Sequence, residues 1–469
     1  MSKRNTPNVN NQAFFNILST VILSGINFFT IPLFTRLLGA ENYGLYSVFH
    51  SWVVILMCVM GLETRAAGGT ALYRFPNEYK GYMASALFLG TLCSAVFIVA
   101  GIIFRDFLGQ ILGFPAWIAV ILLLCAFGHY VVEFARSMFT YTKKAHMNFL
   151  VSVSLSVITI LLSLLLVYVM NKKGQEALYQ AQVYGVTVPY LVVAAILWIY
   201  IFSRKPVLYK KEYWGYCLQM GLPIVFHVLA NDLLKQSNKL MLGYLGYAGV
   251  TVGIYSFLCT FTGILNTILS ALNTSWCPFY YDDLNENASE RLAVKSKNYL
   301  ELFAVLACGF LLVGREFCYV FASEEYWPGI DVVPILVLGV YFVFMYQFCV
   351  NFEFYNRKTK VVAVGTVSAA LGNILLNLLL IPKLGMYGAA IATALSYGLL
   401  FVAHFIIAKN LKEMKFHMKL KDFVPGLTAV VACMGLFYLL SGAWYIRWLL
   451  GVALGIYLVI KVARRKTIF

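Results

Sequence analysis

Long apolar runs follow one another along almost the whole chain, separated by short polar stretches. Each run has roughly the 20 residues that an α-helix needs to cross the hydrocarbon of a bilayer. Strands of a lipid-facing barrel would be about half as long and would alternate residue by residue. We therefore predict an all-α integral membrane protein with about 14 transmembrane helices, over residues 13–35, 43–62, 82–104, 115–141, 147–170, 179–202, 213–242, 250–272, 299–320, 332–354, 361–381, 386–407, 423–440 and 443–460.

The composition supports this prediction, with 61% hydrophobic and 12% charged residues in 469. Soluble domains carry about a quarter of charged residues. The net charge of +16 does not indicate a nucleic-acid partner, because most Lys and Arg residues fall in alternate connecting segments, including the polar stretch 280–297. The positive-inside rule places those segments, and both chain ends, in the cytoplasm.

Two short segments repeat each other. Leu38-Gly39 is followed by Gly-Leu-Tyr-Ser at the start of the second run, and Leu245-Gly246 by Gly-Ile-Tyr-Ser at the start of the eighth. Both copies follow an odd-numbered run, so the two halves would be parallel repeats about an axis along the membrane normal. Internal repeats that form a site at their interface are typical of secondary transporters.

Polar residues form a stripe on the run 213–242. At 100° per residue, one half of this helix carries His227, Asn231, Asp232, Lys235, Gln236, Asn238 and Lys239. The other half is apolar except for Ser237. Ionisable residues are costly in lipid and indicate function by default, so this half is expected to line a polar cavity.

The run 115–141 has a similar face, formed by His129, Glu133, Arg136 and Thr140. Weaker polar seams include Asn27 in the first run, and Asn373 and Asn377 in the eleventh. One central hydrophilic cavity would account for all four faces. A simpler explanation is that Glu133–Arg136 and Asp232–Lys235, each three residues apart, neutralise themselves, and that the Asn residues tie helices together.

The two strongest faces together carry an excess of positive charge, with Arg136, Lys235 and Lys239 against Glu133 and Asp232. A positive cavity favours an anion such as a lipid diphosphate, because Lys and Arg donate charge-assisted hydrogen bonds to it. No phosphate-binding loop, serine-hydrolase elbow or H-E-x-x-H pair occurs, and the ten Cys lie singly. We therefore expect no enzyme activity, no metal and no cofactor. Coupling to a proton or sodium gradient through Asp232 or Glu133 stays open.

Two segments resemble a known family. Residues 31–39, followed by Tyr43-Gly44, and residues 377–393 are similar to signatures of the polysaccharide repeat-unit flippases, which export O-antigen, capsule and exopolysaccharide units. These flippases belong to the multidrug/oligosaccharidyl-lipid/polysaccharide exporter superfamily. Arg36 lies in the first segment and joins the candidate substrate-binding residues, which are Asn27, Arg36, His129, Glu133, Arg136, Asn231, Lys235, Asn238, Lys239, Asn373 and Asn377.

The resemblance implies two pseudo-symmetric six-helix lobes around a central cavity, over 1–206 and 207–410, and two extra C-terminal helices over 411–469. It also implies alternating access in a bacterial inner membrane, with an undecaprenyl-diphosphate-linked oligosaccharide as cargo and polysaccharide assembly enzymes as possible partners. Relatives often carry an Asp-Arg pair late in the seventh helix, where this chain has Asn238-Lys239.

Three other functions are compatible with the span pattern. A multidrug exporter of the same superfamily would take organic cations and should have an acidic cavity. A membrane glycan polymerase or ligase would need a large outer loop bearing Arg or His residues, and the predicted outer loops are short. A purely structural membrane protein would not explain four polar faces.

Overall fold

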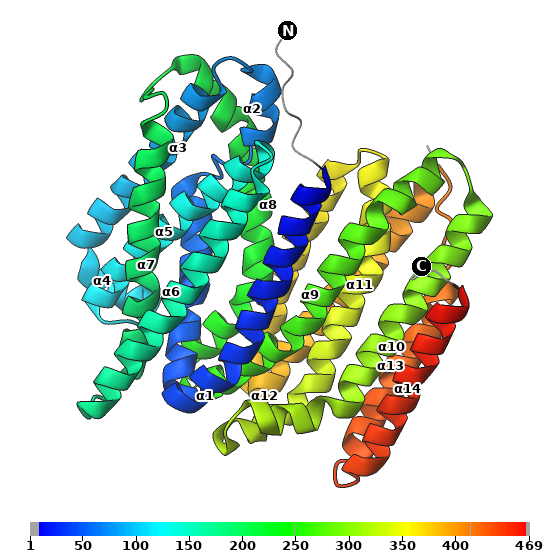
Figure 1. Cartoon of the computed structure of the whole chain (residues 1–469). Helices are drawn as coiled ribbons and strands as arrows, with labels where there is room; N and C mark the ends of the chain where they lie inside the picture. The colour runs from blue at the N-terminus through cyan, green and yellow to red at the C-terminus, as the bar shows by residue number, and fades with distance from the viewer. Residues whose placement is uncertain (1–8, 248, 413, 466–469) are drawn as a thin grey trace. The chain divides into compact units, whose positions relative to one another are not determined.

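The computed structural model describes the backbone of residues 9–247, 249–412 and 414–465, and the side chains of these residues except 9–21, 23, 24, 27, 28 and 465. Regular secondary structure in this part of the chain is helical throughout. The chain divides into two compact units, Met1–Gln236 and Ser237–Phe469. Figure 1 draws the first in blue to green and the second in green to red.

The first unit contains α1 (Val9–Gly61), α2 (Gly68–Arg74), α3 (Tyr79–Ile103), α4 (Arg105–Leu112), α5 (Ala116–Tyr141), α6 (Ala145–Lys172), α7 (Leu178–Phe202) and most of α8 (Lys211–Tyr244). The second contains the end of α8, α9 (Gly249–Asn285), α10 (Ser289–Phe321), the 3-10 helix η1 (Glu324–Val332), α11 (Val333–Tyr355), α12 (Thr359–Asn410), α13 (Leu420–Leu439) and α14 (Trp444–Arg465). The division falls inside α8, later than the lobe boundary expected at residue 206, and the lobes themselves stay a prediction.

Twelve helices of the described chain are long and apolar enough to cross a membrane. Two of them are broken by a glycine with non-helical backbone angles, α1 at Gly39 and α12 at Gly385. Each of these long helices therefore holds two predicted runs, 13–35 with 43–62 and 361–381 with 386–407. The short helices α2 and α4 were not expected. The prediction of an all-α, multi-span membrane protein is confirmed.

The repeated Leu-Gly pair has a structural basis. Gly39 has a φ of 70° and Gly246 a φ of 87°, and Gly385, also preceded by leucine, has a φ of 54°. Residues with a Cβ rarely adopt these angles, whereas glycine adopts them readily. The pair thus marks the point at which the chain leaves one span and enters the next, once in the first unit and twice in the second.

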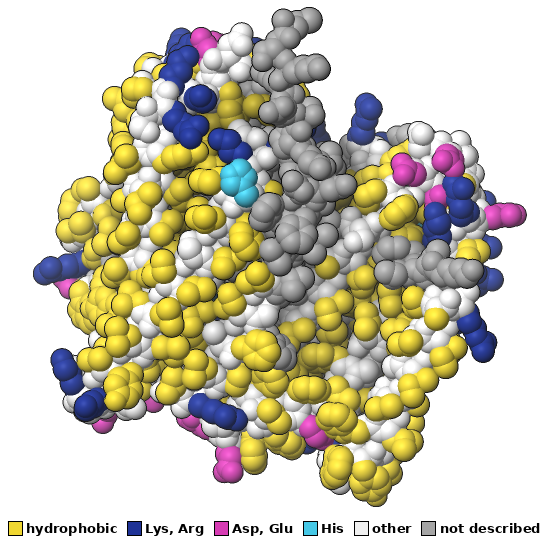
Figure 2. Space-filling view, viewed as in Figure 1, with side chains coloured by type: hydrophobic (Ala, Val, Ile, Leu, Met, Phe, Trp, Pro, Cys, Tyr) yellow, Lys and Arg dark blue, Asp and Glu magenta, His cyan; other side chains and the backbone are white. Residues whose placement is uncertain are grey.

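Apolar side chains on the outside of the first unit fit a lipid surround. On α3, Leu92, Val96, Val99 and Ile103 are exposed and recur at the spacing of one helix face. On the face shown in Figure 2, hydrophobic side chains cover the middle of this unit and Lys and Arg gather toward its ends. Inside the unit, α1 packs against α5, α6 and α7, and α3 packs against α5.

In the second unit, α11 packs closely on α12 and also on α9, and α13 and α14 both pack on α10. Charged pairs hold α14 in place: Arg447 donates to Glu316, and Lys461 donates to Glu301. The polar stretch 280–297 is helical except at residues 286–288. Its buried carboxylate, Asp283, accepts bonds of 2.7 Å from both Arg291 and Lys295, which joins the end of α9 to the start of α10.

Candidate functional site

A line of alternating charges runs between the end of α1 and the end of α5. The Arg65 guanidinium donates to both carboxylate oxygens of Glu63, at 2.8 and 3.1 Å. It also lies 3.6 Å from Glu133, whose other oxygen accepts a 2.5 Å bond from Arg136. Arg136 continues to the Asn148 side chain of α6 at 3.2 Å. Of the two predicted residues, Glu133 is thus paired with both Arg136 and Arg65, and Arg136 is paired with Glu133.

The backbone beside this line is strained. Leu62 and Glu63 have φ values of 49° and 45°, which L-residues with a side chain seldom adopt. Gly221 of α8 faces this turn, because a Cβ there would lie 3.0 Å from the Leu62 carbonyl oxygen. Strained backbone persists where surrounding contacts fix it, often at functional sites. The close approach of α8 at Gly221 and the Glu63–Arg65 bonds supply such contacts.

His129 lies one turn before Glu133 on the same face of α5. Its ring stacks on Tyr190 of α7, with centroids 3.6 Å apart and 7° between the planes. The His50 ring approaches edge-on at 6.2 Å. The buried Nε2 atom of His129 has no hydrogen-bond partner among the described residues.

The polar stripe of α8 has contacts within the first unit up to Gln236 and within the second unit from Ser237 onward. Asp232 lies within electrostatic range of Lys235, Glu63 and Arg65, and the Gln236 side chain accepts a 3.0 Å bond from Ser51 of α1. Asn231 and Asp232 are half-buried, while Lys235 is exposed. From Ser237 onward the stripe bonds to residues of the second unit.

A buried amide network lies in the second unit, around the predicted residues Asn238, Asn373 and Asn377. Asn377 donates to Asn238 at 2.6 Å and to Asn373 at 2.9 Å. Asn238 in turn donates to Tyr255 of α9 at 3.0 Å and to Thr393 of α12. Because the three amides are bonded mainly to one another and to α9 and α12, they hold α8 in the second unit. Their role in substrate binding stays a prediction.

Three further residues complete the predicted set. Lys239 is half-buried and forms no ion pair with any described residue. Arg36 is exposed near the end of the first half of α1. The side chain of Asn27 lies outside the described ones.

The structure adds residues that the sequence analysis did not select. Glu63 and Arg65 follow an apolar run and were assigned to a connecting segment, so their contact with α5 was not anticipated. Glu353 is a lone ionisable residue at the end of the run 332–354, and His404 is one late in the run 386–407. An inventory of lone ionisable residues in the apolar runs would have found this pair.

Outside the spans, one ion pair fixes the start of α8. Lys210 donates to Glu78 at 2.6 Å, and Tyr213 donates to the same carboxylate. The Lys210 hydrogen bond lowers the pKa of Glu78, and the same bond raises the pKa of Lys210. Glu78 comes directly before α3, so the pair ties α8 to α3 at one end of the first unit.

Comparison with known proteins gives a consistent result. The family model described as "polysaccharide biosynthesis protein" matches residues 9–281. Among curated proteins, "Lsg locus putative protein 1" of Haemophilus influenzae is 22% identical over 357 residues, covering 72% of this chain and 82% of that protein. An uncharacterized membrane protein of Methanocaldococcus jannaschii is 22% identical over 444 residues, covering 86% and 84%.

Solved structures share the fold. The lipid II flippase MurJ in an inward closed conformation has a TM-score of 0.72 at 13% identity, with 97% of this chain and 98% of that chain covered. An inward-facing multidrug resistance transporter of the MATE family has a TM-score of 0.62 at 12% identity, with 87% and 94% covered.

Proposed function

The chain belongs to the polysaccharide biosynthesis protein family of membrane transporters, and from that premise we propose that it flips an undecaprenyl-diphosphate-linked oligosaccharide repeat unit across a bacterial inner membrane. The unit would enter from the cytoplasmic leaflet and leave to the outer leaflet by alternating access. Both chain ends would lie in the cytoplasm, as the distribution of Lys and Arg favours. O-antigen, capsule or exopolysaccharide assembly would supply the cargo.

The observation that carries the proposal is the state of Lys235 on α8. This side chain is exposed on a helix that is apolar enough to span the membrane. A charged Lys facing lipid within a span is costly, so such residues face water-filled space. No described carboxylate lies within ion-pair distance of it. An exposed ammonium inside a span is suited to bind an anionic group such as a lipid diphosphate.

The balance of charge among the candidate residues supports an anion rather than a cation. Arg65 and Glu63 join the predicted residues and cancel each other, as do Arg136 and Glu133. Asp232 lies within electrostatic range of Lys235 without forming an ion pair with it, and Lys235 and Lys239 together exceed this single negative charge. An exporter of organic cations should instead have an acidic cavity, so the net positive charge argues against the multidrug alternative.

The fold shared with the lipid II flippase MurJ adds support through architecture alone. A glycan polymerase would need a sizeable outer segment with catalytic side chains. The connection between α6 and α7, residues 173–177, and η1 are both short.

The first test is genetic. The gene is deleted in its host, and undecaprenyl-diphosphate-linked glycans are extracted and assigned to a leaflet by their accessibility to a membrane-impermeant glycosidase. A complete repeat unit that accumulates on the cytoplasmic side, and is cleared when the intact gene returns, supports the proposal and identifies the cargo. Normal glycan export combined with altered sensitivity to cationic dyes would move the protein to the drug-exporter group.

A further inference from the structure

A buried acid–base pair joins α11 to the second half of α12. The Nδ1 atom of His404 lies 2.7 and 2.9 Å from the two carboxylate oxygens of Glu353. The His404 side chain is 1% exposed and the Glu353 side chain 0%. An isolated carboxylate would be very costly at this depth. The imidazole is the hydrogen-bond partner that lowers this cost.

The charge state of Glu353 decides where the protons of the pair sit. With Glu353 ionised, Nδ1 of His404 carries the hydrogen that the carboxylate accepts, which leaves a lone pair on Nε2. This Nε2 atom is buried and has no hydrogen-bond partner in the described chain. A base of this form, held by a carboxylate on one nitrogen and open on the other, can take up one proton at Nε2.

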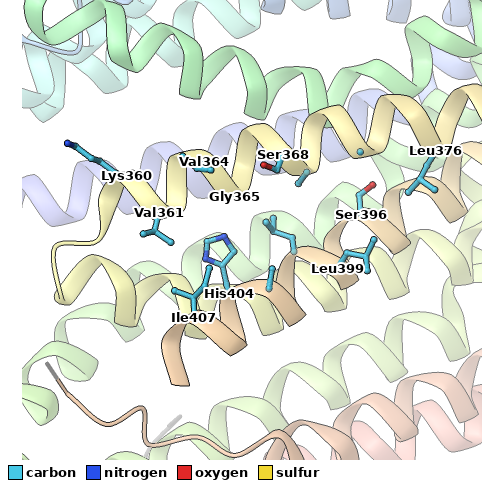
Figure 3. A pocket seen from close by; sticks show the side chains of 14 residues that line it. Lys360, Val361, Val364, Gly365, Ser368, Leu376, Ser396, Leu399, His404 and Ile407 are labelled. Atoms are coloured by element: carbon cyan, nitrogen blue, oxygen red, sulfur yellow. The ribbon is translucent and has the colours of Figure 1, made fainter. Parts of the chain in front are cut away.

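His404 lies beside a pocket. A pocket of ≈ 520 Å³ lies between the two halves of α12, and His404, Ser368 and Ser396 are among its lining residues. Figure 3 shows the His404 ring between the two halves of the helix. Gly365 leaves room for the ring, because a Cβ at that position would lie 2.2 Å from Nε2.

We infer that Glu353 and His404 form a proton-binding site, with Nε2 of His404 as the atom that takes up the proton. Proton uptake turns the neutral imidazole into imidazolium and breaks no covalent bond. The unprotonated pair has one net negative charge, and the protonated pair has none. A change of net charge inside a membrane protein alters the cost of burying the site, so protonation changes the stability of the buried pair. The inference rests on the proposed transport function in making the proton the coupling ion.

The surroundings leave this pair as the main titrating unit of the pocket. From α11, Tyr346 approaches the His404 ring edge-on at 5.1 Å, and Cys349 lies one turn before Glu353. From α12, Lys360 lines the rim of the pocket and is exposed. The neighbouring parts of α9 and α13 approach α11 with the Asn273 amide, at 2.8 Å from Asn351, and the Phe423 ring.

Nitrogen-15 NMR of histidine-labelled protein in lipid nanodiscs tests the site directly. The six His residues are assigned by single substitutions, with H404N identifying the signal of interest. At high pH we expect the neutral tautomer with hydrogen on Nδ1, and on acidification we expect both nitrogens to become protonated. In E353Q the midpoint of this titration should fall by at least one pH unit, a tenfold loss of proton affinity, because the compensating carboxylate charge is gone.

His417 provides the control within the same unit, since it bonds to Ser296 rather than Glu353. Its titration should be unchanged in E353Q. A His404 signal that stays neutral between about pH 5 and 9, or a midpoint that E353Q leaves in place, overturns the inference. If E353Q does not fold, the wild-type titration decides by itself.

The measurement needs no glycan, so its result is separate from that of the flippase test. A titrating pair in a protein that does not move lipid-linked glycan would keep the proton site and refute the proposed function. Glycan flipping by a protein whose Glu353–His404 pair does not titrate would keep the proposed function and refute the proton site.

Discussion

The Nη1 atom of Arg65 lies 3.6 Å from Oε2 of Glu133, so the turn after α1 and the end of α5 belong to one line of charges. The contact gives Arg65 a second carboxylate besides Glu63, which is 5% exposed. Glu63 could not stay buried and ionised without a partner. Arg65 is therefore a structural tie of the first unit as well as part of its polar face.

Replacing Arg65 by Ala should destabilise the first unit by about 2 kcal/mol, because it leaves Glu63 buried without its cation. The double variant E63Q/R65A should regain most of this loss, since a neutral amide replaces the unpaired charge. Thermal unfolding of the purified protein in detergent measures both. Arg105→Ala, at an exposed position at the start of α4, is the matched control and should unfold as wild type does. Equal stability of R65A and wild type would show that the tie is dispensable.

Replacing Lys235 and Lys239 together by Ala should lower the rate of glycan flipping in proteoliposomes by at least about tenfold, since each lost charge-assisted bond to a diphosphate is worth about 1.5–3 kcal/mol. Insertion and thermal stability should be preserved, because neither ammonium has an ion-pair partner among the described residues.

Lys172→Ala, at the exposed end of α6, removes a charge outside the proposed cavity and should leave flipping unchanged. Full activity of the K235A/K239A protein at wild-type abundance would remove both residues from the substrate site.

The sequence was sufficient for the spans because hydrophobicity over 20 residues is a local signal. It also located the turns at Gly39 and Gly246 through the repeated Leu-Gly pair. It could not show that α9 and α10 continue into the polar stretch 280–297, because the pairing of Asp283 with Arg291 and Lys295 is what stabilises those helical ends.

The candidate site residues were predictable only where they lie on the same helix, because periodicity is a local signal. A helical wheel groups residues on one helix, so it found Glu133 with Arg136, which the structure shows paired. It cannot tell an open face from a packed one, and Asn238, Asn373 and Asn377 are buried against one another. Pairs between helices, such as Arg65 with Glu133 or Glu353 with His404, depend on tertiary packing that periodicity does not encode.

Asn238 holds α8 to the rest of the second unit, and its replacement by Leu tests this. The change leaves Tyr255, Thr393 and Asn377 without the amide they bond to, which should cost about 2–3 kcal/mol. Thermal unfolding in detergent would show the loss as a lower midpoint. Asn171→Leu, at an exposed position near the end of α6, makes the same chemical change without buried partners and should have little effect. An N238L protein as stable as wild type would mean that water replaces the amide.

His417, between α12 and α13, should make the second unit sensitive to acid. Burial lowers the pKa of its imidazole to about 4, while the unfolded value is about 6.5. Between these values the unfolded chain binds more protons than the folded one, so stability falls as the pH drops from about 6.5 to about 4. The loss from this residue reaches about 3 kcal/mol at most. His417→Gln can keep a hydrogen bond to Ser296, which lies 3.0 Å from the imidazole, but it cannot titrate.

H417Q should therefore lose less stability than wild type between about pH 7 and pH 4.5, as followed by thermal unfolding in nanodiscs at each pH. His146→Gln, at an exposed position at the start of α6, is the control and should follow the wild-type curve. Coincident curves for H417Q and wild type would show that the buried imidazole does not govern the acid response.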